Sequence, residues 1–306
     1  MSIGTTTRTE ADDLEPRSLL EVTSNARRRE RISRIMSVVM FGCVMAAVVP
    51  LVLLLWQVVS NGATAFGWEF ITRIEPLSYR DRGGGYLHGI VGTLYMTGIA
   101  TLLAVPLGIA AAVYLSERPN GRYASVVRFF TDVMTGVPSI FVGLAVYALL
   151  VSGSGGFGLG FGTLAGATSL AIIMLPIVVR SSEEMLRLVP ADLRAASYGL
   201  GAREWQTTLR VTLPAAAPGL TTGAILAVAR GAGETAPLIL TALGARQVVT
   251  SLTGAPQSDI GLLMLDGFTQ PFDAGIERAW AGGLTLILIT LLLSIGARIV
   301  ASRRQI

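Results

Sequence analysis

Hydrophobic residues along this chain gather in long runs rather than in the shorter alternating patterns of a soluble protein. A helix needs about 20 mostly apolar residues to cross the hydrocarbon core of a bilayer. The runs predict six spans, at residues 35–59, 87–115, 133–151, 163–180, 218–243 and 279–300. The chain is therefore expected to be an all-α integral membrane protein with six transmembrane helices.

The arginines predict the orientation of these spans. Of the 24 basic residues, 18 fall in the two terminal segments and in the loops after the second and fourth spans. Because positive residues accumulate on the cytoplasmic side, both termini are expected in the cytoplasm, with residues 1–34 as a polar cytoplasmic tail. The net charge of +4 is explained by topology and does not indicate nucleic-acid binding.

Composition excludes several classes of chemistry. All 24 basic residues are arginine, and a chain without lysine has neither a P-loop nor a lysine Schiff base. A single histidine (His88) and a single cysteine (Cys43) allow no internal disulfide and make a His/Cys zinc site improbable. An intramembrane enzyme would need a Ser/His, Asp/Asp or metal constellation, and none is visible, so we expect no enzyme and no cofactor bound by this chain.

Two charges lie inside the fifth predicted span, Arg230 and Glu234. Charges at bilayer depth are costly, so both are expected to face a bundle interior or a wet cavity, where their spacing of four lets them pair. One interpretation is a structural ion pair. The other is an anion pathway, in which the guanidinium binds oxyanion oxygens and Glu234 accepts a hydrogen bond that hydrogen phosphate can donate and sulfate cannot.

The loop at residues 181–217 predicts two short helices, at about 192–198 and 202–211, around a pair of glycines. Trp205 and Leu209 fall on one face of the second helix. Periodicity alone fits an amphipathic helix that anchors the loop at the lipid surface as well as it fits a helix that docks on a protein partner.

Residue order in this loop resembles the cytoplasmic "EAA" loop of binding-protein-dependent ABC importer permeases. That pattern is E-A-A, three residues, G, nine residues and I-x-L-P. The matching positions here are Ala195, Ala196, Ser197, Gly201, Val211, Leu213 and Pro214, with alanine in place of the glutamate. The resemblance implies a type I ABC importer permease fold and a coupling helix that docks on a separate ATPase subunit, with Asp192, Arg194 and Trp205 as further candidate contacts.

The segment Ala-Arg-Gly-Ala-Gly-Glu-Thr-Ala-Pro at 229–237 is similar to the A-type permeases (PstA) of the bacterial phosphate-specific (Pst) importer. This resemblance covers residues 84–300. It implies a phosphate pathway at Arg230, Glu234, Gly231, Gly233 and Thr235. It also implies a homologous PstC-type permease, PstB-type ATPases that carry ATP and Mg, a PstS-type phosphate-binding protein and a location in the bacterial plasma membrane. A permease for sulfate, molybdate or phosphonate, or a phosphate-sensing scaffold, remains an alternative.

Four smaller expectations concern other polar residues. His88 is expected at the membrane interface, and Asp132 at the start of a helix. Glu183 and Glu184 are expected to be solvated. The acidic residues of the outer loop at 246–278, Asp259 among them, are expected to contact a binding protein.

Overall fold

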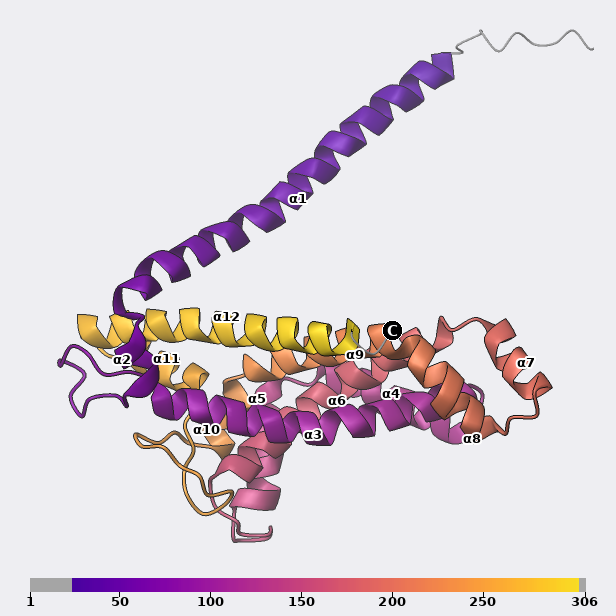
Figure 1. The fold of residues 1–306 in the computed structure, drawn as a ribbon. Coiled ribbons are helices and arrows are strands. Elements are labelled where there is room, and N and C mark those ends of the chain that lie inside the picture. Colours follow the sequence, from indigo (N-terminus) through magenta and orange to yellow (C-terminus); the bar gives the residue numbers. More distant parts are fainter. Residues whose placement is uncertain (1–23, 303–306) are drawn as a thin grey trace, which may run out of the picture. The chain divides into compact units, whose positions relative to one another are not determined.

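The computed structural model describes residues 24–302, which form helices joined by loops and contain no β-strand (Figure 1). The chain divides into two compact units, one ending at Trp56 and the other beginning at Gln57.

The first helix, α1 (Ser24–Ala65), is long and apolar enough to cross a membrane and contains the predicted span at 35–59. It begins earlier than the sequence pattern suggests. Residues 24–34, assigned to the polar tail, are helical, because arginine and glutamate are both good helix formers. Residues 1–23 of the predicted tail lie outside the described residues.

The unit from Gln57 onward contains three helices that are long and apolar enough to cross a membrane. They are α3 (Leu87–Glu117), α6 (Thr163–Arg187) and α12 (Asp273–Ser302). A fourth long helix, α9 (Leu213–Ala232), packs against all three. The core between these helices is made of small and flexible side chains, among them Met96, Ala100, Leu170 and Met174. Small residues at such positions let helix backbones approach closely in a bilayer.

The third span is broken and is not the single helix predicted at 133–151. It consists of α4 (Arg122–Gly136) and α5 (Ser139–Val146), and a π-helical turn, Tyr147–Val151, follows α5. The two halves are bent by 108°. The break falls at Pro138, which lacks a backbone N–H and forces the preceding Val137 into an extended conformation.

The fifth span also differs from the prediction of one helix at 218–243. The helix predicted at about 202–211 does not end before this span begins. Instead α8 (Glu204–Thr207) and a π-helical turn, Thr208–Thr212, continue directly into α9. The helix then stops at Gly233, and a separate α10 (Ala236–Thr241) follows, with Pro237 in its first turn.

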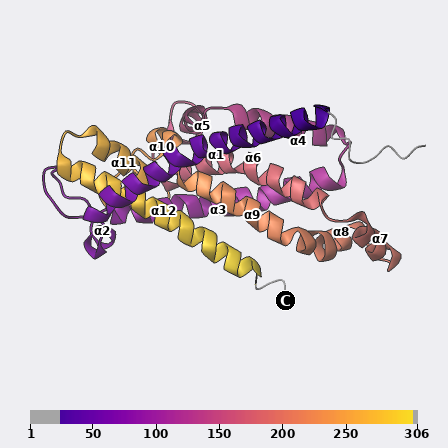
Figure 2. The ribbon, with the colours of Figure 1, turned by 90° about the horizontal axis from the view of Figure 1, so that it is seen from above.

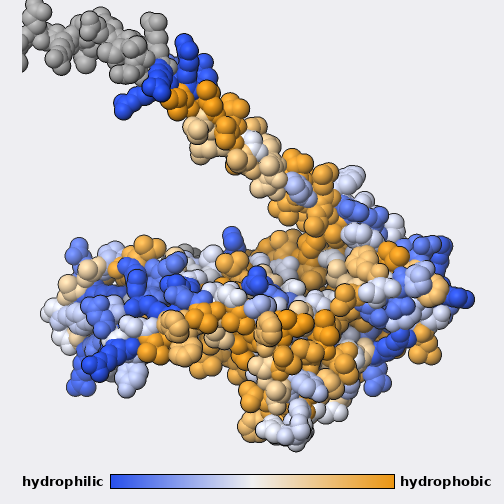
Figure 3. Space-filling view, turned by 180° about the vertical axis from the view of Figure 1, so that it is seen from behind, coloured by the Kyte–Doolittle hydropathy of each residue, from blue (hydrophilic) through white to orange (hydrophobic). Residues whose placement is uncertain are grey.

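The remaining helices lie at the two ends of this bundle. Figures 1 and 2 place α7 (Ala191–Gly199) and α8 at one end, and α2 (Trp68–Thr72) and α11 (Ile260–Thr269) at the other. We call these the α7 end and the α11 end. On the face seen in Figure 3, hydrophobic residues form a band between hydrophilic ends of the bundle. The described residues contain five helices able to cross a membrane, or six if the bent pair α4–α5 is one span.

Candidate functional site

Arg230 and Glu234 form an ion pair at the end of α9, as their spacing predicts. Arg230 lies in the last turn of α9, and its Nη2 is 2.9 Å from Oε1 of Glu234, which follows the helix end at Gly233. The two side chains differ in exposure: Arg230 is 59% exposed and Glu234 only 15%. A guanidinium that is half open keeps N–H donors available to a second anion.

The open side of Arg230 faces a cavity of about 300 Å³ between α4, α5, α6 and α9. Among the described residues that line the cavity, Arg230 is the only charged one. Two hydroxyls lie in the same lining, on Thr135 and Ser139, and that of Thr135 donates to the backbone carbonyl of Asp132 at 2.6 Å. The other lining residues are Met134, Val137, Val142, Ile172, Ile173, Pro176 and Ile177. The guanidinium of Arg230 therefore offers a charged hydrogen-bond donor within an otherwise apolar lining, while Glu234 offsets part of its charge.

The polar part of this cavity lies at the break in the third span. Thr135 lies just before the break at Pro138, and Ser139 opens α5 just after it. Positions four apart are neighbours on a straight helix as well, so the sequence spacing already favours placing these two side chains together. The bend is held by close packing on the far side of α5, where a Cβ on Gly143 would lie 2.7 Å from Cα of Pro237.

Four predicted pathway residues do not line the cavity with Arg230; of these, Glu234 contacts its side chain through the ion pair. Gly231 is buried, and a Cβ there would lie 2.6 Å from Sδ of Met174, so its role is to let α9 approach α6. Gly233 and Thr235 line a different hollow beside α11. Sequence reasoning missed Thr135 and Ser139, although their spacing of four is a signal that places both hydroxyls on one helix face.

The predicted coupling loop has two helical segments that are held together by their own hydroxyls. Oγ of the buried Ser197 on α7 lies 2.9 Å from Oγ1 of Thr207 on α8. Gly201 between them has a φ of +82°, a conformation that favours glycine. Asp192, Ala195 and Ala196 are exposed. A group of exposed apolar residues covers the same surface: Leu193, Tyr198, Leu200, Trp205 and Leu209.

Not every residue predicted to couple lies on that surface. Ser197 is turned inward, and Arg194 hydrogen-bonds to residues of its own chain. Leu213 and Pro214 form the first turn of α9, within the continuous helix that begins at Glu204. They fix where the loop enters the bundle, and Pro214 is tolerated there because α8 and the π-helical turn precede it without requiring its N–H.

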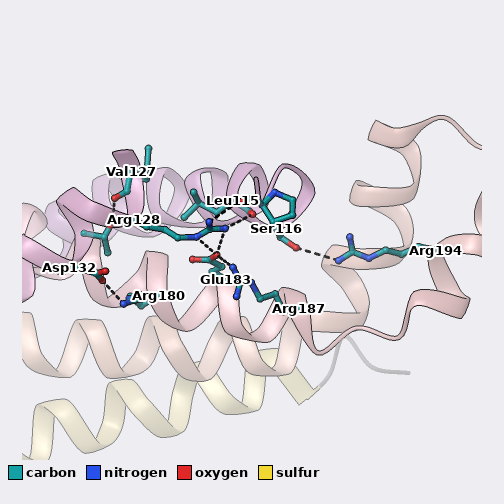
Figure 4. A network of polar contacts seen from close by, with 11 residues as sticks. Leu115, Ser116, Val127, Arg128, Asp132, Arg180, Glu183, Arg187 and Arg194 are labelled. Atoms are coloured by element: carbon teal, nitrogen blue, oxygen red, sulfur yellow. Dashed lines mark hydrogen bonds and ion pairs between the residues drawn. The ribbon is translucent and has the colours of Figure 1, made fainter. Parts of the chain in front are cut away.

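The expectation that both glutamates of the 181–217 loop are solvated is wrong for Glu183. It is 3% exposed, and its Oε1 accepts hydrogen bonds from Arg128 on α4 and Arg187 on α6 (Figure 4). Glu184, its neighbour, is exposed. Asp132 is also misassigned: it lies in the second half of α4, away from the helix start, and pairs with Arg180 on α6.

At the α11 end, His88 lies in the first turn of α3 and is fully buried within the protein. One further expectation is corrected there. Asp259 caps the N-terminus of α11, where its side chain accepts hydrogen bonds from the Gly261 N–H and the Thr93 hydroxyl, and at 3% exposure it cannot contact a partner. In the loop before α3, burial raises the pKa of Glu75, against the opposing charge of Arg278.

No group of three or more metal-ligating side chains occurs in the part of the chain that the structure describes. The ionisable side chains form ion pairs instead. Two of these pairs join α4 to α6, and a third holds Arg230, which also lines the cavity.

Comparison with protein families gives one match, to "Binding-protein-dependent transport system inner membrane component", over residues 104–306. The chain is 39% identical over 290 residues to "Phosphate transport system permease protein PstA 1" of Mycobacterium tuberculosis H37Rv, covering 91% of each chain. It is 39% identical over 249 residues to the PstA of Xylella fastidiosa strain 9a5c, covering 81% of this chain and 85% of that one. These relatives are named as transport permeases and not as enzymes.

Solved structures support the fold. A bacterial ABC transporter involved in the import of the acidic polysaccharide alginate matches with a TM-score of 0.63 at 16% identity, covering 90% of this chain and 99% of that one. The MetNI methionine ABC transporter in an inward-facing conformation matches with a TM-score of 0.58 at 20% identity, covering 71% and 95%. The predicted class, an all-α ABC importer permease, is confirmed.

Proposed function

Since the chain belongs to the binding-protein-dependent transport permeases, and within them to the PstA family, we propose that it is a membrane-spanning subunit of an ATP-driven importer of inorganic phosphate. The observation that supports this most directly is the Arg230 cavity, which joins one accessible guanidinium to the hydroxyl of Ser139 inside an apolar bundle. A phosphate dianion needs hydrogen-bond donors of this kind, and a charged donor binds it more strongly than a neutral one.

The Arg230–Glu234 pair also supports phosphate over sulfate. Glu234 lowers the net charge of the site, so that an anion is attracted without being held too tightly to leave. An ionised carboxylate accepts hydrogen bonds only, which suits hydrogen phosphate and repels an oxyanion that has no proton. A permease for sulfate, molybdate or phosphonate is the alternative. The selectivity of transport among these anions distinguishes it from a phosphate permease.

Energy for transport would come from a partner, because this chain has no lysine for a P-loop. The proposed docking surface is the exposed apolar group on α7 and α8, with Asp192, Ala195 and Ala196 beside it. A patch of this kind on a short helix is typical of a protein contact. The ATPase, of the PstB type, would carry the ATP and Mg.

The other partners follow from the same family. A homologous PstC-type permease would complete the pathway on the open side of Arg230, and an extracytoplasmic PstS-type protein would deliver phosphate at the α11 end. The arginine distribution supports a cytoplasmic α7 end with both termini on that side, in the bacterial plasma membrane. A signalling role as a phosphate-sensing scaffold is compatible with transport and adds no residue to the site.

Substrate competition tests this proposal. The complex of this chain with its partner subunits is reconstituted in vesicles, and ATP-dependent uptake of radiolabelled phosphate is measured with excess unlabelled phosphate, arsenate or sulfate. Phosphate and arsenate, which carry a proton near neutral pH, should compete, and sulfate should not. Competition by sulfate at equal concentration would favour the alternative oxyanion permease.

A further inference from the structure

Arg194 lies on the predicted coupling helix α7, yet its guanidinium points into the bundle (Figure 4). Its Nη1 donates to Oε1 of Glu117 at 3.1 Å, at the C-terminal end of α3. Its Nη2 donates to the backbone carbonyl of Leu186 at 3.0 Å, in the last turn of α6, and lies 3.4 Å from Oγ of Ser116. One side chain therefore joins the coupling helix to the ends of two membrane helices.

The second half of the coupling loop also lies beside Glu117. The hydroxyl of Thr208, in the π-helical turn that leads into α9, donates to the carbonyl of Glu204 at 3.0 Å and lies 3.4 Å from the Oε1 that binds Arg194. Both sides of the loop thus approach one carboxylate, and Arg194 makes the shorter bond to it. The hydroxyl contact between Ser197 and Thr207 closes the loop a few residues away, so the two segments are tied to each other and to α3.

This contact is sheltered from solvent. The side chain of Arg194 is 20% exposed and that of Glu117 is 16% exposed. Salt screens such a pair less than it screens a surface pair. A planar guanidinium with donors committed in two directions also has little freedom to reorient, so it transmits displacement better than a single flexible contact would.

We propose that Glu117 and Arg194 form a strut that carries movement of the docked coupling helix to α3 and α6, and that Arg194 is a positioning residue for coupling and not a contact of the ATPase. This inference rests on the proposed docking of an ATPase at α7 and α8. In this proposal Glu117, which lies outside the coupling loop in sequence, takes part in coupling. Arg194 then has a different role from its exposed neighbours on α7, which are the candidate ATPase contacts.

The Arg128–Glu183–Arg187 group shows by contrast what the strut adds. That group joins α4 to α6, and Arg128 also donates to the carbonyls of Leu115 and Pro119. None of these acceptors or donors lies on α7 or α8, so the group fastens the bundle end without reaching the coupling loop. The Arg194 contacts do reach it.

The test measures phosphate transported per ATP hydrolysed by the reconstituted complex, together with the amount of ATPase subunit that copurifies. The variants are Arg194→Ala, Glu117→Gln, Arg194→Lys and the exchanged pair Glu117→Arg with Arg194→Glu. The control is Arg122→Ala, an exposed arginine at the start of α4 near the same end of the bundle.

We expect Arg194→Ala and Glu117→Gln to lower the ratio of phosphate to ATP about fivefold or more, the lower end of typical coupling factors, while the ATPase still copurifies. Arg194→Lys should keep an intermediate ratio, since lysine makes the ion pair without the fork of donors. The exchanged pair should recover at least half of the wild-type ratio, and Arg122→Ala should match the wild type.

Three results would overturn the strut: an unchanged ratio in Arg194→Ala, loss of the ATPase from that complex, or an exchanged pair no better than the single variants. The second result would make Arg194 an ATPase contact. Failure of the proposed function is distinguishable, because the wild-type complex itself would then take up no phosphate. The same variants would in that case be compared with whichever oxyanion the wild type carries.

Discussion

Glu183→Gln should destabilise this protein far more than the same change at the next residue, Glu184→Gln. Glu183 is buried, and one of its oxygens lies 2.9 Å from Nε and 2.8 Å from Nη2 of Arg128. Arg187 reaches the same oxygen from one turn further along α6. Glu184 is exposed, so its replacement serves as a matched control.

The expected magnitude follows from what each arginine loses. Removing one partner of a buried ion pair costs about 3–5 kcal/mol. Arg128 is 23% exposed and keeps the carbonyls of Leu115 and Pro119 as acceptors, which places the loss at the lower end of that range. The pair with Arg187, whose side chain is 54% exposed, adds about 0.5 kcal/mol at most. We expect a loss of about 3 kcal/mol for Glu183→Gln and under about 0.5 kcal/mol for Glu184→Gln.

Reversible unfolding in mixed micelles of mild and denaturing detergent measures both variants on one scale. Replacing Arg128 by alanine should then cost less in the Glu183→Gln background than in the wild type, because only its bonds to the carbonyls of Leu115 and Pro119 are left to lose. Equal losses for the two glutamate variants, or full additivity with the arginine change, would show that the α4–α6 ion pair does not hold the bundle end together.

Three further outcomes are expected. Gly231→Ala should cost about 1–3 kcal/mol, since its Cβ would lie 2.6 Å from Sδ of Met174, and a double-mutant cycle with Met174→Ala should be non-additive; additive losses would contradict this packing. Gly201→Ala should lower stability by about 1–2 kcal/mol because of its φ of +82°, whereas Gly199→Ala, also in open space, should not; equal melting temperatures would refute the strain. The pKa of Glu75 is raised on folding, so its contribution to stability is present below pH 4.5 and is lost as pH rises through the folded pKa. Unfolding free energies of the wild type and Glu75→Gln should therefore diverge above pH 4.5, and a constant difference would count against burial of this carboxyl.

The sequence predicts the long helices well, because an apolar run of span length has few other stable structures. It does not predict where a span breaks. Pro106 and Pro176 lie inside continuous helices, while Pro138 marks a bend of 108°, and the three look alike in sequence. Neighbouring helices decide which proline is accommodated, and that information is tertiary.

The candidate site shows the same division. Spacing alone predicts the pair of Arg230 and Glu234, because a separation of four is local. The hydroxyls of Thr135 and Ser139 reach Arg230 only through the fold. Burial separates Glu183 from Glu184, and partners on α3 and α6 turn Arg194 inward; neither is encoded in the residue type. Motif likeness identified the coupling loop without showing which of its residues face a partner.

The most direct test of the central claim is ATP-dependent phosphate uptake by the reconstituted complex containing Arg230→Gln. Arg298→Gln, an exposed arginine on α12, is the control. Glutamine keeps much of the side-chain length and loses the charge that makes the cavity attractive to an anion. If phosphate passes at Arg230, uptake should fall about tenfold or more, the loss of one charge-assisted contact, while ATP hydrolysis and Arg298→Gln uptake persist. Wild-type uptake by Arg230→Gln would contradict the pathway and leave its pair with Glu234 a structural one.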